Sequence, residues 1–502
     1  MHFSSTVVLS FLGFSSRGLA ATVHSRGESL PSILRNPGNH WSSQTTLSFP
    51  GDARFENVTE RWTIYEPPTF NAAVSPATEN DVVEAVKLAR AYNLSFLATG
   101  GRHGYGTTLG NLHGGLSIDL SQMNSVKVDK RAGLLTVGPG VRFRNIVGPV
   151  EDAGFEIQTG TCSCPGMIGV TIGAGIGRLA GVHGLLIDAL VSARVVTADG
   201  RVLEVSAKSN PDLFWGIRGA GANFGIITSA TYKLHPRIDY YTAFDFVFPA
   251  STNATYFNTI QKLIHGHKGP ATMPEKLASS TSVVYNATTN QPQLIASWVY
   301  AGPQHEAMQV MAPILAIKAD RTVISRLPWS RLNTETGFGS DASVCLPEKL
   351  LDIYTTNVRK FDAPTYTSVF QKFADFYQKY PDARGSSFLV EAFPNQATTA
   401  VPDSATAYPW RDSVTYLLLQ FTWGTGSASE AQANAFGQEL RRELVATSGF
   451  NDVVAYVNYA HGDEKIEQIY GKNKLPRLAS LKAKYDPQNV FAFNNALPSK
   501  YP

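Results

Sequence analysis

The chain has 502 residues and a formal net charge of +3, with 43% hydrophobic and 17% charged residues. This length allows more than one structural unit, each with a sizeable core. The near-neutral charge argues against nucleic acid or an anionic membrane as a partner. Beyond the N-terminus, no apolar run reaches the roughly 18 residues needed to cross a bilayer.

Residues 1–21 are typical of a secretory signal peptide. A short apolar core precedes small residues around Ala20, although the usual leading Lys or Arg is missing, and a buried N-terminal segment is the alternative. Asparagine sequons, which agree with secretion, lie at Asn57, Asn93, Asn253 and Asn286. We therefore expect a secreted glycoprotein.

The first half of the chain alternates helices, strands and glycine-rich loops. Residues 78–92 begin with the capping residue Thr78 and predict an amphipathic helix, which is followed by a strand at 94–98. Further helices are expected at 143–152 and 212–224, and further strands at 116–120, 134–138, 190–197, 201–206 and 225–234. The pair Asp199-Gly200 predicts a hairpin between two of these strands.

Nearly every third residue from Gly160 to Gly184 is glycine, and Arg178 is the only formal charge there. The hydrophobic residues of this stretch repeat with neither the helical period of 3.6 nor the strand period of 2, so we expect neither a helix nor a strand there. Such a run suits close backbone approach to a large cofactor, whereas a glycine-rich surface loop is the alternative. The dinucleotide fingerprint G-x-G-x-x-G fits Gly173 and Gly175 but fails at Arg178, which disfavours a Rossmann fold.

Upstream, the strand at 94–98 runs into T-G-G-R-H-G-Y-G, residues 99–106. A single histidine is usually structural, but His103 lies among four glycines that give it little to pack against, which favours a functional role. The three cysteines are Cys162, Cys164 and Cys345, an odd number that leaves at least one thiol free. No companion cluster at metal-ligand spacing exists, so we expect no metal site.

After residue 236 the pattern changes to an α+β arrangement. Helices between strands, without strict alternation, predict an antiparallel sheet with helices on one face. Strands are expected at 241–248, 278–287, 292–301, 386–393 and 414–423, and helices at 254–265, 304–315, 363–380 and 428–447.

Taken together, these motifs resemble the vanillyl-alcohol oxidase superfamily, and specifically its berberine bridge enzyme-like branch. The matching segments are G-G-R-H-G-Y (100–105), the stretch 160–184, N-P-D-L-F-W-G-I-R-G-A-G-A-N-F-G-I-I-T (210–228), Y-V-N-Y (456–459), Y-G-K-N (470–473) and K-Y-D-P-Q-N-V-F (484–491). The resemblance implies a two-domain PCMH-type FAD-binding fold. It places a FAD-binding domain at 60–236, a substrate-binding domain at 237–450 and a C-terminal return to the first domain at 451–502.

The resemblance also implies the cofactor and its ligands. His103 matches the histidine attached to the flavin 8α-methyl group, and Cys162 the cysteine attached to flavin C6, so FAD is expected to be bicovalent. Cys164 has no assigned role, and whether it pairs with Cys345 is left open. The complete expected cofactor-binding set is Gly100, Gly101, Arg102, His103, Gly104, Cys162, Gly166, Met167, Gly169, Gly173, Gly175, Gly177, Ile227 and Asn494.

Two positions depart from the family pattern. Arg102 replaces a common glycine, and its side chain is expected either near the cofactor pyrophosphate or flavin C2 carbonyl, or in solvent. Pro165 occupies a position linked to oxygen access, which leaves oxidase and dehydrogenase behaviour both open.

The oxidation needs a base. Tyr459 matches the family's base, Tyr456 its neighbour and Tyr105 a substrate-side tyrosine, although without the resemblance these aromatics would be read as packing. Gln420 is the candidate on strand 414–423, with Tyr416 or Leu418 as register alternatives. No acidic residue is expected there, which argues against C–C bridge formation.

The expected function is oxidation of an alcohol or hemiacetal carbon, in a carbohydrate or a secondary metabolite, by hydride transfer to FAD. Molecular oxygen is the expected acceptor and the protein is expected to be a monomer. The alternatives are a dehydrogenase with another acceptor, and a flavin-bound scaffold that steers a cyclisation without net oxidation. A serine hydrolase is disfavoured because G-x-S-x-G is absent.

Overall fold

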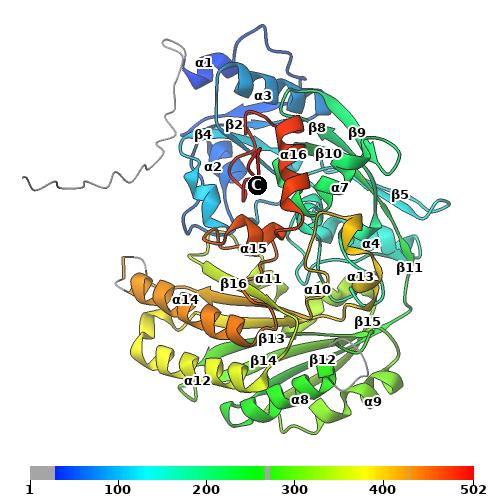
Figure 1. The fold of residues 1–502 in the computed structure, drawn as a ribbon, viewed down its shortest axis with the longest axis vertical. Helices are drawn as coiled ribbons and strands as arrows, with labels where there is room; N and C mark the ends of the chain where they lie inside the picture. The colour runs from blue at the N-terminus through cyan, green and yellow to red at the C-terminus, as the bar shows by residue number, and fades with distance from the viewer. Residues whose placement is uncertain (1–28, 266–271, 425, 428) are drawn as a thin grey trace, which may run out of the picture.

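The structure, a computed structural model, describes residues 29–265, 272–424, 426–427 and 429–502. The expected signal peptide, residues 1–21, lies outside these ranges. Figure 1 shows two packed units. We call residues 29–240 with 451–502 the small-sheet unit, and residues 241–450 the large-sheet unit. The chain therefore leaves the small-sheet unit once and returns to it at its end.

The described part of the small-sheet unit contains sheets with the strand orders β1-β2-β4-β3, β5-β6-β10-β8-β9 and β11-β7. In the first, β2 and β3 run parallel to β4, and the pairs of the second are antiparallel. The strands are β1 (Thr46–Ser48), β2 (Phe70–Ser75), β3 (Phe96–Thr99), β4 (Gly115–Asp119), β5 (Val126–Asp129), β6 (Leu134–Val137), β7 (Phe155–Glu156), β8 (Leu190–Val196), β9 (Val202–Ser206), β10 (Ile226–Lys233) and β11 (His235–Pro236).

Capping and burial explain the helix that follows β2. Thr78 and Asp81 form a capping box at the start of α3, and Val82, Val86 and Ala89 are buried on its inner face, as predicted. The helices of this unit are α1 (Leu30–Leu34), α2 (Ala53–Thr59), α3 (Glu79–Ala91), α4 (Phe143–Asp152), α5 (Met167–Gly173), α6 (Leu186–Ala189), α7 (Pro211–Ala220), α15 (Ile466–Tyr470) and α16 (Leu475–Tyr485).

The large-sheet unit is built on a seven-stranded sheet of order β15-β12-β14-β13-β17-β18-β16, whose neighbours all pair antiparallel. Its strands are β12 (Tyr241–Phe248), β13 (Leu277–Asn286), β14 (Gln291–Tyr300), β15 (Arg321–Leu327), β16 (Asp352–Val358), β17 (Ser387–Ala392) and β18 (Thr415–Phe421). Its helices are α8 (Asn253–His265), α9 (Gln304–Leu315), α10 (Leu332–Glu335), α11 (Asp341–Val344), α12 (Ala363–Lys379), α13 (Gln396–Ala400) and α14 (Ser429–Thr447).

One face of the large sheet is covered by helices, as predicted. Helices α8, α9 and α12 lie along the side away from the small-sheet unit (Figure 1), and their apolar residues and those of α14 share one core with the strands. Helix α14 lies beside α12 and also contacts the small-sheet unit through Arg441 and Asp463. The opposite face of the sheet is turned toward the small-sheet unit. Among the described residues, no helix combines the length and apolar character needed to cross a membrane.

The structure contains elements that the sequence analysis did not predict, and three of them bear on the site or on the large sheet. The stretch 160–184 contains a helix, α5, because its first half lacks positive-φ residues until Ala174 and Gly175 end the helix. Strands β15 and β16 were not predicted. Strand β16 is buried along its whole length and so shows no alternation, whereas β15 lies at the sheet edge and is mostly exposed.

The two units are joined covalently beside the glycine-rich stretch. Cys164 of the small-sheet unit forms a disulfide with Cys345 of the large-sheet unit, which resolves the pairing left open above. Next to it, the backbone N–H and the hydroxyl of Ser163 both donate to the carboxylate of Asp341, at 2.8 and 2.6 Å. The loop that carries Cys162 is thereby fixed to the segment after α10.

We predict that removing this disulfide destabilises the protein. The double variant Cys164→Ser/Cys345→Ser should lose about 2–5 kcal/mol of unfolding free energy, because the bond links positions 181 residues apart. Urea unfolding with and without dithiothreitol measures it. Reductant should lower the wild type to the level of the variant and leave the variant unchanged; equal effects of reductant on both would contradict the prediction.

Candidate functional site

The His103 loop and the Cys162 loop touch backbone to backbone. A Cβ on Gly101 would lie 2.2 Å from the Gly166 nitrogen, and one on Gly166 would lie 2.7 Å from the Gly101 nitrogen. Glycine is therefore required at these positions by the packing of one loop on the other. By contrast, a Cβ on Gly169, in α5, would enter open space.

The other glycines of the expected cofactor set also pack against protein atoms. A Cβ would meet Pro139 O at Gly100 (2.2 Å), Leu109 Cδ1 at Gly104 (3.3 Å), the Asn458 amide at Gly173 (2.3 Å), Leu186 Cβ at Gly175 (2.3 Å) and Thr159 O at Gly177 (2.0 Å). These residues shape the backbone around the site. Close approach to protein atoms already explains the glycines at 100, 175 and 177, whereas the contact at Gly104 is with a flexible Leu109 side chain.

His103 lies at the centre of the site. Its ring stacks on Trp62 with centroids 4.3 Å apart. A ring nitrogen of His103, the Cys162 sulfur and the Cys164 sulfur all lie within 4.8 Å of one another. Burial, together with the nearby Arg142, lowers the pKa of His103 to about 3. The imidazole is therefore neutral, with a nitrogen lone pair available.

Cys162 is the one free cysteine of the described chain, and it is half-buried. Burial raises the pKa of its thiol to about 12, with a further contribution from Asp341 and Glu391. Because Cys164 is bonded to Cys345, Cys162 alone offers a thiol to the space beside His103. The structure thus brings together the two residues expected to hold the cofactor.

Arg102 is bound on the protein side and does not extend into solvent. Its guanidinium pairs with the buried carboxylate of Asp119 at 3.1 Å and donates to the carbonyl of Val58. The residue itself has a positive φ of 56°. Its side chain therefore supports the loop from Asp119 and does not point into solvent; its placement near the cofactor stays a prediction.

Three further residues of the cofactor set also belong to the small-sheet unit. Met167 and Ile227 are buried in the main core of the small-sheet unit. Asn494 is exposed and accepts a hydrogen bond from Asn495.

Tyr459 is held by a buried carboxylate that the sequence analysis missed. Its hydroxyl donates to Oε2 of Glu391 at 2.8 Å, and the Thr161 hydroxyl donates to Oε1 of the same residue at 2.9 Å. Glu391 lies on β17, opposite Tyr416 of β18. Strand 414–423 carries no acidic residue, as expected, but the neighbouring strand supplies one, Glu391, which is the single charge of an apolar segment.

The pKa values of this pair shift in a way that matters for proton transfer. Burial raises the pKa of Glu391 above its ordinary value, against the opposing hydrogen bonds from Tyr459 and Thr161. Burial, with the nearby Glu391 carboxylate, raises the pKa of Tyr459 well above its ordinary value. Tyr459 is therefore a protonated phenol that donates to a carboxylate.

The hydroxyl groups of Tyr456 and Tyr105 differ in their hydrogen bonding. The Tyr456 hydroxyl accepts from the Gly175 backbone N–H at 3.1 Å and from the Asn458 amide at 2.8 Å, so Tyr456 fixes the glycine-rich loop. Its ring packs edge-on against Tyr459. Tyr105 packs on Trp62, and its buried hydroxyl has no hydrogen-bond partner among the described residues.

Gln420 does not join the site. Its side chain accepts a hydrogen bond from Ser387 on the neighbouring strand. Leu418, two residues earlier on the same face of β18, packs in a cluster with Trp62 and Tyr459. Of the register alternatives, Leu418 and Tyr416 lie next to the paired tyrosines, whereas Gln420 lies further along the strand.

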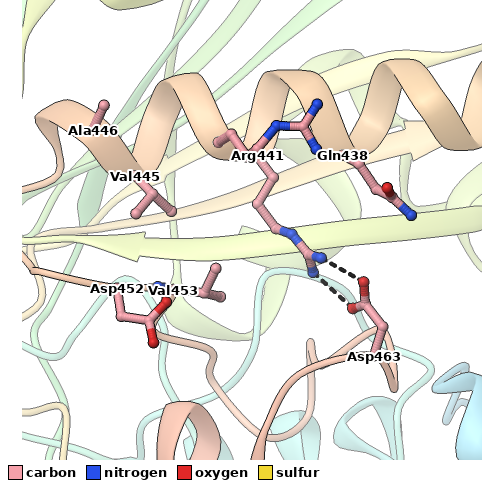
Figure 2. A pocket seen from close by; sticks show the side chains of 8 residues that line it. Gln438, Arg441, Val445, Ala446, Asp452, Val453 and Asp463 are labelled. Carbon is pink, nitrogen blue, oxygen red and sulfur yellow. Dashed lines mark hydrogen bonds and ion pairs between the residues drawn. The ribbon is translucent and has the colours of Figure 1, made fainter.

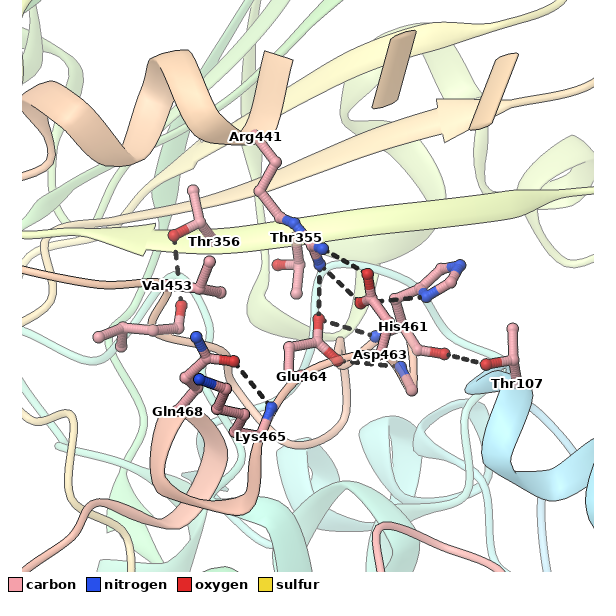
Figure 3. A network of polar contacts seen from close by, with 12 residues as sticks. Thr107, Thr355, Thr356, Arg441, Val453, His461, Asp463, Glu464, Lys465 and Gln468 are labelled. Carbon is pink, nitrogen blue, oxygen red and sulfur yellow. Dashed lines mark hydrogen bonds and ion pairs between the residues drawn. The ribbon is translucent and has the colours of Figure 1, made fainter. Parts of the chain in front are cut away.

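A polar network fixes the turn that follows Tyr459 (Figure 3). The His461 carbonyl accepts from the backbone N–H and the hydroxyl of Thr107, just after the His103 loop. The His461 imidazole pairs with Asp352 at 3.0 Å and with Asp463 at 3.2 Å, and it stacks on Tyr354. The Tyr459 turn, the His103 loop and the large sheet are thus connected.

A shallow surface pocket lies beside this network (Figure 2). It is lined by Gln438, Arg441, Arg442, Val445, Ala446, Asp452, Val453 and Asp463. The central cation, Arg441, is already neutralised by Asp463 and Glu464. The pocket contains none of the expected site residues, and we assign it no ligand.

Comparison with known proteins identifies the family of this chain. Residues 70–206 match the family model described as FAD binding domain, and residues 455–498 the model described as berberine and berberine like. The FAD-linked oxidoreductase OXR1 of Pyricularia oryzae is 50% identical over 99% of this chain and 99% of its own.

Solved structures share the fold. BBE-like 1 of Physcomitrella patens has a TM-score of 0.82 at 21% identity, covering 95% of this chain and 100% of that chain. Glucooligosaccharide oxidase from Acremonium strictum, described with 6-S-cysteinyl, 8α-N1-histidyl FAD, has a TM-score of 0.78 at 21% identity, covering 91% and 98%.

The His461 network predicts a pH-dependent stability. Burial alone would lower the pKa of His461, but pairing with Asp352 and Asp463 raises it to about 9. Because the folded pKa exceeds the unfolded value of about 6.5, the stabilisation is complete below pH 6.5 and is lost as pH rises toward 9. The wild type should lose up to about 3 kcal/mol over this interval.

Urea unfolding at pH 6 and pH 9.5 measures this loss. His461→Gln should remove most of the difference between the two pH values. His113→Gln, which changes an exposed histidine outside every ion pair of the described chain, is the matched control and should keep the wild-type difference. An unchanged difference in His461→Gln would refute the assignment.

Proposed function

Because the chain belongs to the berberine bridge enzyme-like FAD-linked oxidoreductases, we propose that it oxidises an alcohol carbon of a small molecule through covalently bound FAD. The observation that carries this proposal is the Tyr459–Glu391 hydrogen bond, which lies in one site with His103 and Cys162. FAD held there by His103 and Cys162 would supply a hydride acceptor that molecular oxygen can reoxidise, with hydrogen peroxide as the product.

The residues of this chain fit FAD. A neutral imidazole and a free thiol lie within 4.8 Å of each other, as two attachments to one ring system require. The Tyr105 hydroxyl is buried without a partner among the described residues, and the space beside Gly169 is open. His103 and Cys162 are therefore the proposed attachment residues. Glucooligosaccharide oxidase from Acremonium strictum carries its FAD on the same two residue types, a cysteine and a histidine.

Tyr459 and Glu391 together act as the base. The raised pKa of Tyr459 means that no phenolate stands ready at neutral pH. Instead, the phenol oxygen accepts the substrate hydroxyl proton while its own proton passes to the Glu391 carboxylate, 2.8 Å away. Negative charge is thus never left on the buried phenol.

The walls around Tyr459 support an apolar substrate. Trp62, Ile353 and Leu418 form a buried cluster, and Tyr105, Leu351, Leu389 and Tyr459 pack against it. A carbohydrate would need a groove rich in polar groups, whereas this surface suits an aromatic or aliphatic secondary metabolite. We therefore propose a secondary-metabolite alcohol as the substrate class, acted on by a secreted, monomeric protein.

The covalent attachment can be tested directly. Acid-denatured wild-type protein should keep its yellow colour on the polypeptide, because His103 and Cys162 each hold the ring. Cys162→Ser should still retain flavin through His103 after denaturation, and so should His103→Ala through Cys162. The double variant should release all of it. Tryptic peptide mass spectrometry measures the linkage, and colour lost from denatured wild type would end the proposal.

The base can be tested by stopped-flow reduction of the flavin. Tyr459→Phe and Glu391→Gln should each slow reduction by about 10²- to 10⁴-fold, because each breaks the proton path. In the wild type, the rate should fall as pH drops through the raised pKa of Glu391, since only the carboxylate accepts a proton.

Gln420→Met is the matched control, because that side chain bonds Ser387 outside the site, and it should reduce flavin at the wild-type rate. A Glu391→Gln variant with wild-type reduction would exclude the carboxylate from the reaction.

A further inference from the structure

Arg178, the single charge of the glycine-rich stretch, is held only by uncharged groups among the described residues. Its Nη1 donates to the Thr161 carbonyl at 3.4 Å and to the Asn333 side-chain oxygen at 3.0 Å. Its Nη2 donates to the Thr336 hydroxyl at 3.2 Å. Asn333 and Thr336 belong to the large-sheet unit, so the guanidinium spans the interface between the units.

No carboxylate forms an ion pair with Arg178 in the described chain, although three lie near enough to affect its charge: Glu391, Asp245 and Asp341. Asp245 accepts from the backbone N–H groups of Gly337 and Phe338. Asp341 is occupied by Ser163, and Glu391 by Tyr459 and Thr161. Each acid thus uses its oxygens on other donors.

A buried guanidinium without an anionic partner costs free energy, because its charge has lost solvation by water. Burial lowers the pKa of Arg178, because the charged form is disfavoured away from water. Arginine nevertheless stays protonated in proteins. Its five N–H groups make three hydrogen bonds to protein acceptors, so Nε and one Nη2 hydrogen have no acceptor among the described residues. Part of the residue remains accessible. These donors can serve a ligand.

Thr161 connects this cation to the proposed base. The Thr161 carbonyl accepts from Arg178, and its hydroxyl donates to Glu391, which in turn accepts from Tyr459. The next residue is Cys162. The unpaired donors therefore belong to the same polar cluster as the proton path, in a site whose other walls are apolar.

We propose that Arg178 binds an acidic oxygen of the substrate, a carboxylate or a phenolate, so that the substrate is an apolar alcohol carrying one anionic group. This inference rests on the proposed function, since it assigns a substrate to the same site. The arginine holds the anion while Tyr459 takes the proton of the hydroxyl. Charge pairing in a site of low dielectric gives the contact its strength and its specificity.

Isothermal titration calorimetry on the FAD-loaded enzyme tests the proposal without turnover. The probes are benzoate, 4-nitrophenolate and the neutral, shape-matched benzamide. Benzoate or 4-nitrophenolate should bind wild type at least tenfold more tightly than benzamide does, and the stronger of the two identifies the anion. Arg178→Gln should weaken the anion by about 10- to 100-fold and change benzamide by less than threefold.

Two variants separate charge from packing. Arg178→Lys keeps the charge and should recover part of the anion affinity. Thr336→Val removes one hydrogen bond to Arg178 but keeps the guanidinium, and it should change anion affinity by less than threefold. Equal weakening of benzoate and benzamide in Arg178→Gln would mean a merely structural role, and this would overturn the proposal.

Two other results would also overturn it. Wild type that does not prefer either anion over benzamide lacks the subsite. A changed flavin spectrum in Arg178→Gln with unchanged anion affinity would mean that the arginine serves the cofactor. Failure of the proposed oxidation is seen separately, as a protein that binds the probes but whose flavin no alcohol reduces.

Discussion

The backbone contact between Gly101 and Gly166 is the constraint on which the site depends. With a Cβ on either residue, atoms would approach to 2.2 or 2.7 Å, so any larger residue would push the two loops apart. His103 lies two residues after the first glycine, and Cys162 four residues before the second. Their separation of less than 4.8 Å is a direct consequence of this contact. The disulfide to Cys345 then fixes the same loops to the large-sheet unit.

The second constraint is electrostatic and concerns how buried charge is shared. Glu391 is fully buried, and burial alone would favour its protonated form. Hydrogen bonds from Tyr459 and Thr161, with the positive charge of Arg178 nearby, favour the carboxylate. Burial remains the larger effect, so the pKa is raised. A carboxylate with a raised pKa is a better proton acceptor than an exposed one, which suits the role proposed for it.

Much of the architecture could be predicted from the sequence, because local periodicity decides it. Strand β12 and helix α9 occur with the predicted bounds, and the Asp199-Gly200 turn joins β8 to β9. Helix α5 was missed because its glycines hide the helical period. Strand β16 was missed because burial on both faces removes the alternation that identifies a strand.

The site itself was only partly predictable, for a related reason. His103, Cys162 and Tyr459 lie in recognisable motifs, so a resemblance identifies them. Glu391 lies on β17, 68 residues before Tyr459, and Tyr459 belongs to the C-terminal segment of the small-sheet unit, so the contact depends on how the two units pack. No local pattern encodes that packing. The lone acid in an apolar strand was the available signal, since a buried carboxylate is rarely kept without a partner.

The same reasoning explains why Arg178 and Glu391 occur together without touching. A direct ion pair would neutralise both, and the carboxylate would then hold its charge too firmly to accept a proton from Tyr459. The intervening Thr161 keeps the two charges apart while hydrogen-bonding to each. The carboxylate stays available to the phenol, and the guanidinium stays available to an anion. Thr161 therefore separates Glu391, the proposed proton acceptor, from Arg178, the proposed anion-binding residue, within a single polar cluster.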